Sequence, residues 1–406
     1  MANGHPKGGL FRRRGEAEEG KVSFIELFFD LVFVFTIIQL SHTMAHHFTP
    51  AGVAEGLVMV LGVWWIWIYT TWAMNWLNPA HMSVRAMLFA MMFLGLVLST
   101  SIPEAFGDRG LFFAGAYVAM QVGRSAFVAF ANRGYDPVRY RNFQRITLWL
   151  AFAGLFWIAG GFAHHEWRLA IWIIALAIEY AAPALGFWVP VLGRSESASW
   201  NVSGAHMAER CALFVIICLG ETILVTGRIF SEGEWTGALM AAFAVAFMTT
   251  LALWWIYFRF GHERGAHLIE GSANPGGVAR AAYTYAHIPI VAGILVTAVG
   301  ADFTLAHPLD AAGAGKAAAI VGGPALFMAG NLWFKGIISG RPPLSHIAGI
   351  AGLAAIFAVA GGLPILLLAA AICALLVAVA VWEYVSLALP RGRSIAAPRI
   401  REGTGK

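Results

Sequence analysis

Long apolar segments follow one another along almost the whole chain, and they restrict its fold more than any other feature. A helix needs about 20 apolar residues to cross the hydrocarbon of a bilayer. Because 59% of the residues are hydrophobic and only 12% are charged, they cannot all be hidden in a water-soluble core. We therefore predict an all-α integral membrane protein with about twelve transmembrane helices, near residues 24–46, 52–76, 84–102, 110–131, 143–163, 167–191, 206–228, 234–259, 278–303, 313–338, 344–362 and 364–389.

Basic residues between these segments predict the orientation. With the N-terminus inside, most of the 27 Lys and Arg residues fall on the inner side, and two lie within segments, Arg124 and Arg210. The outer side carries only Arg109, Arg168, Arg228 and Lys316. Since cytoplasmic loops are rich in Lys and Arg, this predicts a multi-pass protein of the cell inner membrane with both termini in the cytoplasm. The basic residues mark topology, so we expect no nucleic-acid binding.

The six segments of the first half resemble those of the second half, in the same order. The second and eighth segments share a Trp-Trp-Ile sequence that starts at Trp64 and Trp254, and the sixth and twelfth share Glu-Tyr at Glu179 and Glu383. Because six is even, both copies have the same orientation, which predicts two parallel six-helix repeats. Such halves can rock about a central site, although a duplication without alternating access would leave the same pattern.

The predicted organisation follows from this repeat. It consists of a cytoplasmic N-terminal tail over 1–22, a first six-helix repeat over 23–192, a cytoplasmic linker over 193–205, a second six-helix repeat over 206–390 and a basic cytoplasmic C-terminal tail over 391–406.

Two acidic residues lie close together in the first segment. Glu26 and Asp30 are four residues apart and share one face of a helix, and Gln39 follows about 13 Å beyond Asp30. Charged side chains at membrane depth are costly, and they are usually functional or paired. The two carboxylates suit a cation or a proton, with Gln39 as a neutral polar contact. The alternative is a structural ion pair with Arg85 or Arg124.

Two further glutamates occupy corresponding places in the last segment of each half. Glu179 and Glu383 are each followed by tyrosine and lie about two turns or more from the inner end. We expect them to pair with basic residues near the inner face, such as Arg85 and Arg280. A pairing that recurs once per half favours a bracing role over ion binding.

Arg124 and Glu221 are the other deep charges that we single out. Arg124 lies about two turns into the fourth segment, where it would neutralise Asp30 or Glu179, or hold an anionic substrate. Glu221 has no basic residue at its level except Arg228, so it is a candidate for binding a proton or a cation. A protonated, hydrogen-bonded packing residue is the alternative for Glu221.

The sequence carries no clear pattern for an enzyme, a metal or a cofactor. It contains no phosphate-binding loop and no H-E-x-x-H or G-x-S-x-G motif, and its three cysteines lack CxxC spacing. His42 and His46 are one turn apart and could grip a metal, but no third ligand is evident. Tyr283 with His287 is the only candidate for a nucleophile and base. We therefore expect a non-enzymatic protein without catalytic residues, metal or cofactor.

Two motifs resemble a known family. The first motif reads Glu26-Leu27-Phe28-Phe29-Asp30-Leu31-Val32-Phe33-Val34-Phe35 and continues to Gln39-Leu40-Ser41. The second motif runs from Glu209-Arg210 through Leu219-Gly220-Glu221-Thr222-Ile223. With the Trp-rich second segment, they are similar to the bacterial low temperature requirement A family from Val22 to about Arg391. The resemblance implies a multi-pass inner-membrane protein, and the family name records growth in the cold rather than a mechanism.

A weaker resemblance points to potassium channels whose subunits hold two six-helix repeats and whose first helix carries an F-S-D motif. Phe28-Phe29-Asp30 is similar in pattern, but Phe29 stands in place of the serine. Leu213 stands opposite Asp30 in the second half, which therefore has no matching aspartate.

These observations favour membrane transport, by an ion- or proton-coupled carrier or by a cation channel. Asp30 and Glu221 would bind the ion or proton, and Arg124 would tune the carboxylates. The expected partners are the lipid bilayer and a small ion or small molecule, and homo-oligomerisation is compatible with the sequence. The competing hypothesis is a non-transporting membrane factor for envelope assembly or cold stress, in which the charges act as braces.

Overall fold

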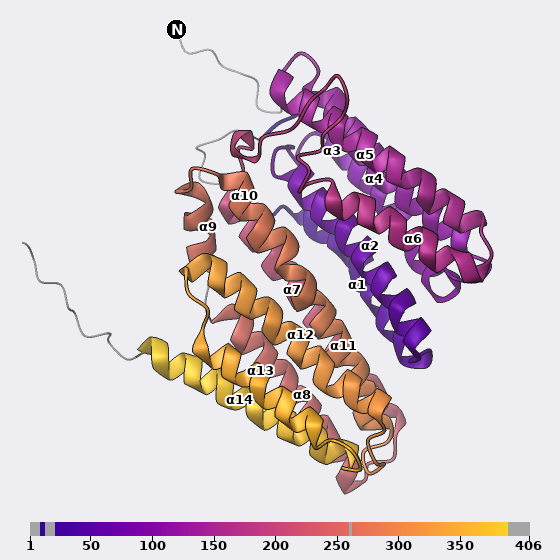
Figure 1. Cartoon of the computed structure of the whole chain (residues 1–406), viewed down its shortest axis with the longest axis vertical. Coiled ribbons are helices and arrows are strands. Elements are labelled where there is room, and N and C mark those ends of the chain that lie inside the picture. The colour runs from indigo at the N-terminus through magenta and orange to yellow at the C-terminus, as the bar shows by residue number, and fades with distance from the viewer. Residues whose placement is uncertain (1–8, 13–20, 260–261, 389–406) are drawn as a thin grey trace, which may run out of the picture.

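The computed structural model describes residues 9–12, 21–259 and 262–388 of the chain, and in these ranges it contains helices and no strand (Figure 1). The predicted tail over 391–406 and most of the tail over 1–22 lie outside the described residues. The longer helices are α1 (Phe24–His46), α2 (Pro50–Met74), α3 (Met82–Ser101), α4 (Gly110–Asn132), α5 (Pro137–Phe162), α6 (His165–Ala181), α7 (Gly204–Glu232), α8 (Gly237–Phe258), α11 (His287–Ala306), α12 (Ala314–Ser339), α13 (Leu344–Ala358) and α14 (Ile365–Ala388). The shorter ones are the 3₁₀ turns η1 (Ile102–Glu104) and η2 (Ser197–Ser199), the α-helices α9 (His262–Glu270) and α10 (Pro275–Ala279), and the π-helical turn η3 (Arg280–Tyr285).

Within the described residues, ten helical segments are long and apolar enough to cross a membrane, so the prediction of a multi-span all-α protein is confirmed at this level. The segments predicted near 167–191 and 344–362 are shorter helices, with 17 residues in α6 and 15 in α13. Helix α6 ends at Ala181, and Pro183 follows two residues later without the N–H that would continue the hydrogen bonds of the helix. The chain then turns through Gly186 and Phe187, whose φ angles are positive.

Local sequence signals fix several helix starts. Thr49 and Asp136 accept hydrogen bonds from backbone N–H groups in the first turns of α2 and α5, and each is followed by a proline that needs no such partner. Ser23 and Glu26 form a capping box at the start of α1, in which the backbone N–H of Ser23 donates to Glu26 at 2.9 Å. Glu26 therefore has a structural role at the end of its helix, in addition to any role in binding.

The helices form two groups, α1–α6 and α7–α14, which lie side by side in Figure 1. In the first group α3 packs on α1 and α4, and α5 packs on α4 and α6. In the second group α11 packs on α7 and α12, and α14 packs on α8 and α13. Helices α1 and α2 contact α7 and α11, so these four helices form the boundary between the groups.

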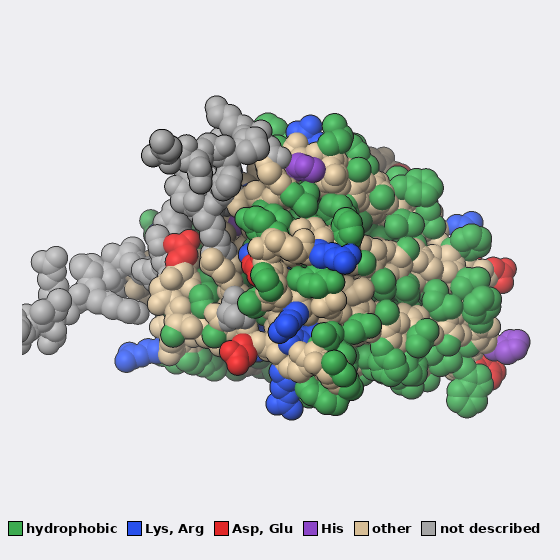
Figure 2. All heavy atoms as spheres, turned by 90° about the horizontal axis from the view of Figure 1, so that it is seen from above, with side chains coloured by type: hydrophobic (Ala, Val, Ile, Leu, Met, Phe, Trp, Pro, Cys, Tyr) green, Lys and Arg blue, Asp and Glu red, His purple; other side chains and the backbone are tan. Residues whose placement is uncertain are grey.

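The flanks of the bundle are apolar. Large side chains such as Leu31, Phe93 and Phe152 have half or more of their surface exposed. Seen from the end of the bundle, Figure 2 shows hydrophobic side chains over much of the flank and several Lys and Arg side chains on the end itself. A soluble protein rarely exposes apolar patches of this extent, whereas lipid accepts them.

Tryptophans in matching sequence positions of α2 and α8 lie in different surroundings. Trp64, Trp65 and Trp67 on α2 are buried at the boundary between the groups, whereas Trp254 and Trp255 on α8 are 45% and 41% exposed. The side chain of Trp64 donates to the backbone oxygen of Thr284 at 3.0 Å, which fixes α2 against the second group. The shared Trp-Trp-Ile sequence is therefore not matched by a shared role.

Helices α11 and α12 pack closely at small residues, and this contact gives a testable prediction. A Cβ added at Gly323 would lie 2.5 Å from the backbone nitrogen of Thr297, whereas one added at Gly322 would meet nothing within 4 Å. We expect Gly323→Ala to lower the free energy of unfolding by about 1–3 kcal/mol, because the backbones must move apart. Gly322→Ala on the same helix is the matched control and should not destabilise. Thermal unfolding of the two variants in detergent would measure this, and equal stability would contradict it.

Candidate functional site

Among the described residues, three side-chain pairs join α1 to α7 by polar contacts, and all three have the same sequence offset. Glu26 contacts His206, Asp30 contacts Arg210 and Ser41 contacts Glu221, each pair being 180 residues apart. The constant offset means that the two helices run in the same direction in fixed register. We call this row of contacts the α1–α7 seam. It brings the sequence-predicted residues Glu26, Asp30 and Glu221 to one boundary.

Asp30 is held by a buried arginine. Arg210 places its two terminal nitrogens 2.6 and 2.8 Å from the carboxylate oxygens, and the Trp67 indole donates to the same carboxylate at 2.9 Å. All three side chains are buried. The expected partners Arg85 and Arg124 are wrong. Arg85 donates to the Pro79 backbone oxygen in the loop before α3, and Arg124 donates to Gln121 and to the Ile66 backbone oxygen. A bidentate arginine pair of this kind is a strong, oriented contact.

Glu26 lies one turn before Asp30 and is also fully used. The His206 imidazole lies 2.8 Å from one carboxylate oxygen, and Arg12 donates to the other at 2.8 Å. Arg12 comes from the segment before α1 and also donates to the backbone oxygens of Met74 and Leu77 at the end of α2. Sequence reasoning counted Arg12 as a tail residue, and it did not single out His206.

Glu221 lies at the other end of the seam and is much less completely paired. The Ser41 hydroxyl donates to one carboxylate oxygen, while the other oxygen is buried without a hydrogen-bond partner among the described residues. Arg228 contacts Asp302 at 3.5 Å and Glu232 at 3.9 Å, so it does not serve Glu221. A buried carboxylate oxygen with no donor can accept a proton or a cation.

Aromatic rings pack in the seam next to the Asp30–Arg210 pair, and the section beyond them is lined by buried apolar side chains such as Ile37 and Cys218. Phe214 on α7 contacts the rings of Phe33 on α1 and of Trp64 and Trp67 on α2. Asp30 and Ser41 are separated by about 16 Å along α1, so this apolar section isolates Glu221 from the charged end. Gln39 is partly buried near the Glu221 end of α1, and its amide makes no hydrogen bond to another described residue.

The sequence matches a known protein family over most of its length. Residues 21–381 match the family described as bacterial low temperature requirement A protein. The chain belongs to this family. An uncharacterized protein of Rhizobium meliloti is 44% identical over 376 residues, which cover 92% of each chain. No solved structure matches the chain significantly.

Arg124 and Glu179 belong to a second network, within the first group of helices. Arg124 donates to Gln121 at 2.5 Å, and Gln121 in turn donates to the Tyr117 hydroxyl at 3.2 Å. Tyr117 donates to Glu179 at 2.5 Å, and the Trp157 indole donates to the same carboxylate at 3.0 Å. Arg124 is thus linked to Glu179 through two side chains and not through a direct ion pair.

Glu383 is paired with a residue that the sequence analysis left out. Lys335 on α12 lies 2.7 and 2.9 Å from its two carboxylate oxygens and also donates to the Ile256 backbone oxygen at 2.6 Å. The predicted partner Arg280 is wrong, because Arg280 donates instead to the backbone oxygen of Pro183. Arg85 is equally wrong as the partner of Glu179. Glu179 joins α6 to α4, and Glu383 joins α14 to α12. These contacts fit the bracing role.

The histidine positions do not assemble a larger cluster. The Nε2 atoms of His42 and His46 lie 3.0 Å apart, and the part of the chain that the structure describes contains no group of three or more His, Cys, Asp or Glu side chains suited to a metal. His287 shares a hydrogen bond of 2.8 Å with the Tyr257 hydroxyl, so Tyr283 is not its polar partner.

Proposed function

We propose that this protein carries out ion- or proton-coupled transport, or cation permeation, along the α1–α7 seam. The observation that supports it most is the seam itself, where charged and polar contacts are buried between two groups of helices. Removing ions from water costs several kcal/mol each, and well-packed apolar side chains often stabilise as well or better. A boundary that served only to hold the groups together would not need these charges. A boundary that opens to water would need them.

The seam suggests a division of roles among its residues. Glu221 would bind the proton or cation, because one of its oxygens lacks a partner among the described residues. The pairs Glu26–His206 and Asp30–Arg210 would close the other end, with the aromatic section between them as a barrier. Transport would then require α1 and α7 to separate locally.

Reconstitution would test this role. Purified protein in liposomes should dissipate an imposed H⁺, Na⁺ or K⁺ gradient faster than protein-free liposomes, as followed with a pH-sensitive dye or an ion electrode. Equal rates with and without protein for all three gradients would contradict the proposal. The role that we propose is transport and not catalysis, and its partners are the bilayer and the transported ion.

We further propose that the chain crosses the membrane twelve times, with α6 and α13 among the spans. Two contacts support this count. Arg145 near the start of α5 donates to the backbone oxygen of Leu192, so the chain after α6 has returned to the end where α5 began. The Ala312 nitrogen donates to the Leu363 oxygen, so the chain after α13 has returned to the level where α12 begins. Each return requires a full traverse of the bundle.

The two parallel repeats are part of the same proposal. The neighbour pairs α1–α3, α2–α6 and α3–α4 in the first group correspond to α7–α11, α8–α14 and α11–α12 in the second. The parallel direction of α1 and α7 along the seam fits copies with equal orientation. The unequal surroundings of the α2 and α8 tryptophans are a difference between the copies, which arises because α2 lies at the boundary.

The twelve-span arrangement predicts which loops lie on the cytoplasmic side of the inner membrane. Single cysteines at the exposed positions Arg141 and Arg341 should resist a membrane-impermeant maleimide in intact spheroplasts and react after lysis. Cysteines at Arg109 and Asp310 should react before lysis. The native cysteines are buried and give a low background. The proposed topology would be refuted by labelling of position 141 in intact spheroplasts.

A further inference from the structure

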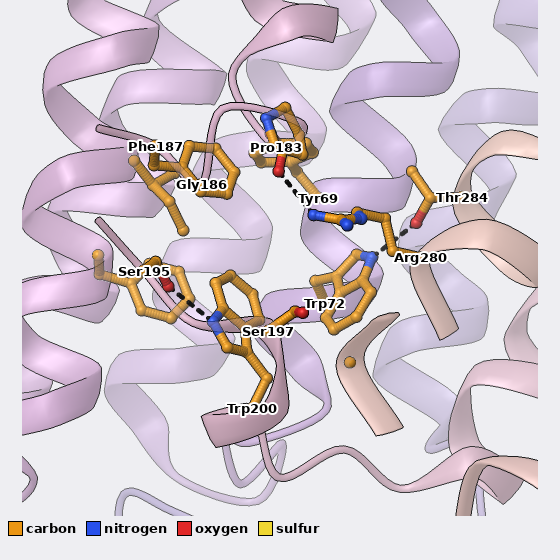
Figure 3. A pocket seen from close by; sticks show the side chains of 13 residues that line it. Tyr69, Trp72, Pro183, Gly186, Phe187, Ser195, Ser197, Trp200, Arg280 and Thr284 are labelled. Atoms are coloured by element: carbon orange, nitrogen blue, oxygen red, sulfur yellow. Dashed lines mark hydrogen bonds between the residues drawn. The ribbon is translucent and has the colours of Figure 1, made fainter. Parts of the chain in front are cut away.

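A separate cavity lies between the two groups of helices, away from the seam (Figure 3). It is bounded by the last turns of α2, the first turns of α5, the segment after α6 and the turn η3. The cavity is partly open to the surroundings. Its walls are largely aromatic and include Tyr69, Trp72, Phe143, Phe187 and Trp200.

Two polar groups in this cavity retain capacity to bind a ligand. Arg280 uses one terminal nitrogen to donate to the Pro183 oxygen at 2.6 Å, and its guanidinium contacts no carboxylate among the described residues. The Tyr69 hydroxyl is buried and has no hydrogen-bond partner in the described part of the chain. Figure 3 shows Tyr69 and Arg280 near the Pro183 side of the cavity.

The indole groups in the cavity are already used. The Trp72 indole donates to the Thr284 hydroxyl, and the Trp200 indole donates to the Ser195 hydroxyl, each at 2.9 Å. These rings therefore offer their apolar faces, while the polar recognition is left to Arg280 and Tyr69. The cavity thus combines one positive charge and one hydroxyl with flat apolar walls.

Unusual backbone surrounds the same cavity. Phe187 has a φ of 49°, which is costly for a residue with a bulky side chain, and it follows Gly186 at a φ of 63°. Arg280 is the first residue of the π-helical turn η3, a form that is rare and often found at functional sites. Two independent departures from regular backbone thus place side chains in one cavity.

We infer that this cavity binds an amphipathic monocarboxylate, a small molecule with one carboxylate and an apolar acyl or aromatic body. The carboxylate matches the single guanidinium and can accept a second hydrogen bond from the Tyr69 hydroxyl. The apolar body matches the aromatic walls, which inorganic anions would leave unused. Because residues of both groups of helices line the cavity, the ligand would contact both. This site does not depend on the proposed transport function.

Calorimetric titration of the protein in nanodiscs, with empty nanodiscs subtracted, tests the inference with octanoate, benzoate and inorganic phosphate as probes. Octanoate and benzoate should bind saturably, with inorganic phosphate at least tenfold weaker. Arg280→Gln should weaken octanoate binding at least tenfold, because a charge-assisted hydrogen bond is lost. Tyr69→Phe should weaken it about three- to tenfold and leave stability intact, because the hydroxyl has no internal partner to lose.

Arg85→Gln is the matched control, because Arg85 also donates to a proline carbonyl, at 3.1 Å, but lies outside the cavity. Its octanoate affinity should equal that of the wild type. The inference would be overturned by octanoate affinity that is unchanged in both Arg280→Gln and Tyr69→Phe. It would also be overturned by an absence of saturable binding, or by phosphate binding as tightly as octanoate. Since no flux is measured, failure here leaves the proposed transport unaffected.

Discussion

Replacing Arg210 by leucine should lower the free energy of unfolding by about 3–5 kcal/mol. The substitution removes both terminal nitrogens that hold Asp30 and leaves that carboxylate buried, with only the Trp67 indole as a donor. A buried charge without its counter-ion retains the full cost of leaving water. Chemical unfolding of the purified variant in mild detergent, followed by tryptophan fluorescence, would measure the loss.

A second substitution separates the charge from the packing. In the double variant Arg210→Leu with Asp30→Asn, no buried charge is left over, so at least half of the lost stability should return. Arg228→Leu on the same helix is the matched control. The Arg228 side chain is 47% exposed, and its ion pairs should contribute less than about 1 kcal/mol. If Arg210→Leu lowered the free energy of unfolding no more than Arg228→Leu, the buried ion pair would contribute no more to stability than an exposed arginine does.

Replacing Glu221 by glutamine should reduce ion-dependent flux in liposomes at least tenfold while leaving the fold stable. The amide oxygen can still accept from Ser41, so the contact between α1 and α7 is kept. The neutral amide cannot take up a proton or balance the charge of a cation. Its NH₂ group would stand in place of the carboxylate oxygen that has no donor among the described residues.

The matched control for this variant is Glu232→Gln, at a side chain on the same helix that is 67% exposed. Its flux should equal that of the wild type at equal amounts of incorporated protein. If Glu221→Gln also kept full flux, Glu221 would not bind the transported ion. If it lost stability together with flux, the packing role of Glu221 would be favoured instead.

The helices could be predicted from the sequence because apolar length decides membrane crossing by itself. The segment predicted near 24–46 is reproduced as Phe24–His46, and the predicted acids of that segment are buried. The end of α6 was predicted ten residues too late, near 191 rather than at Ala181, because apolar residues continue past Pro183 in a segment that is no longer helical. Hydropathy does not report such a break, although proline does.

The partners of the charges could not be predicted in the same way. Which basic residue meets Asp30 depends on how α1 is rotated and shifted against α7, and a single sequence contains no measure of that register. Proximity along the predicted membrane depth favoured Arg85 and Arg124, yet Arg210 is the partner. The one available signal was the second family motif, which begins with Glu209-Arg210 and lies on the helix that faces the first motif.

The seam also supports the competing role to a limited extent. Asp30 and Glu26 are fully paired, as expected of braces in a protein that does not transport. Glu221 is the residue that separates the two hypotheses, because a brace requires partners and this carboxylate has an oxygen without one in the described part of the chain.

Thiol accessibility at Ser41 is the most direct test of whether α1 and α7 separate. Ser41 is 2% exposed at the seam, and Thr36 is equally buried on α1 but faces Ser99 within the first group. With the native cysteines replaced by alanine, cysteines at the two positions would be exposed to a small charged methanethiosulfonate in liposomes carrying an ion gradient. Opening of the seam predicts modification of Ser41→Cys while Thr36→Cys stays protected. Protection of both positions under every gradient would contradict transport along the seam.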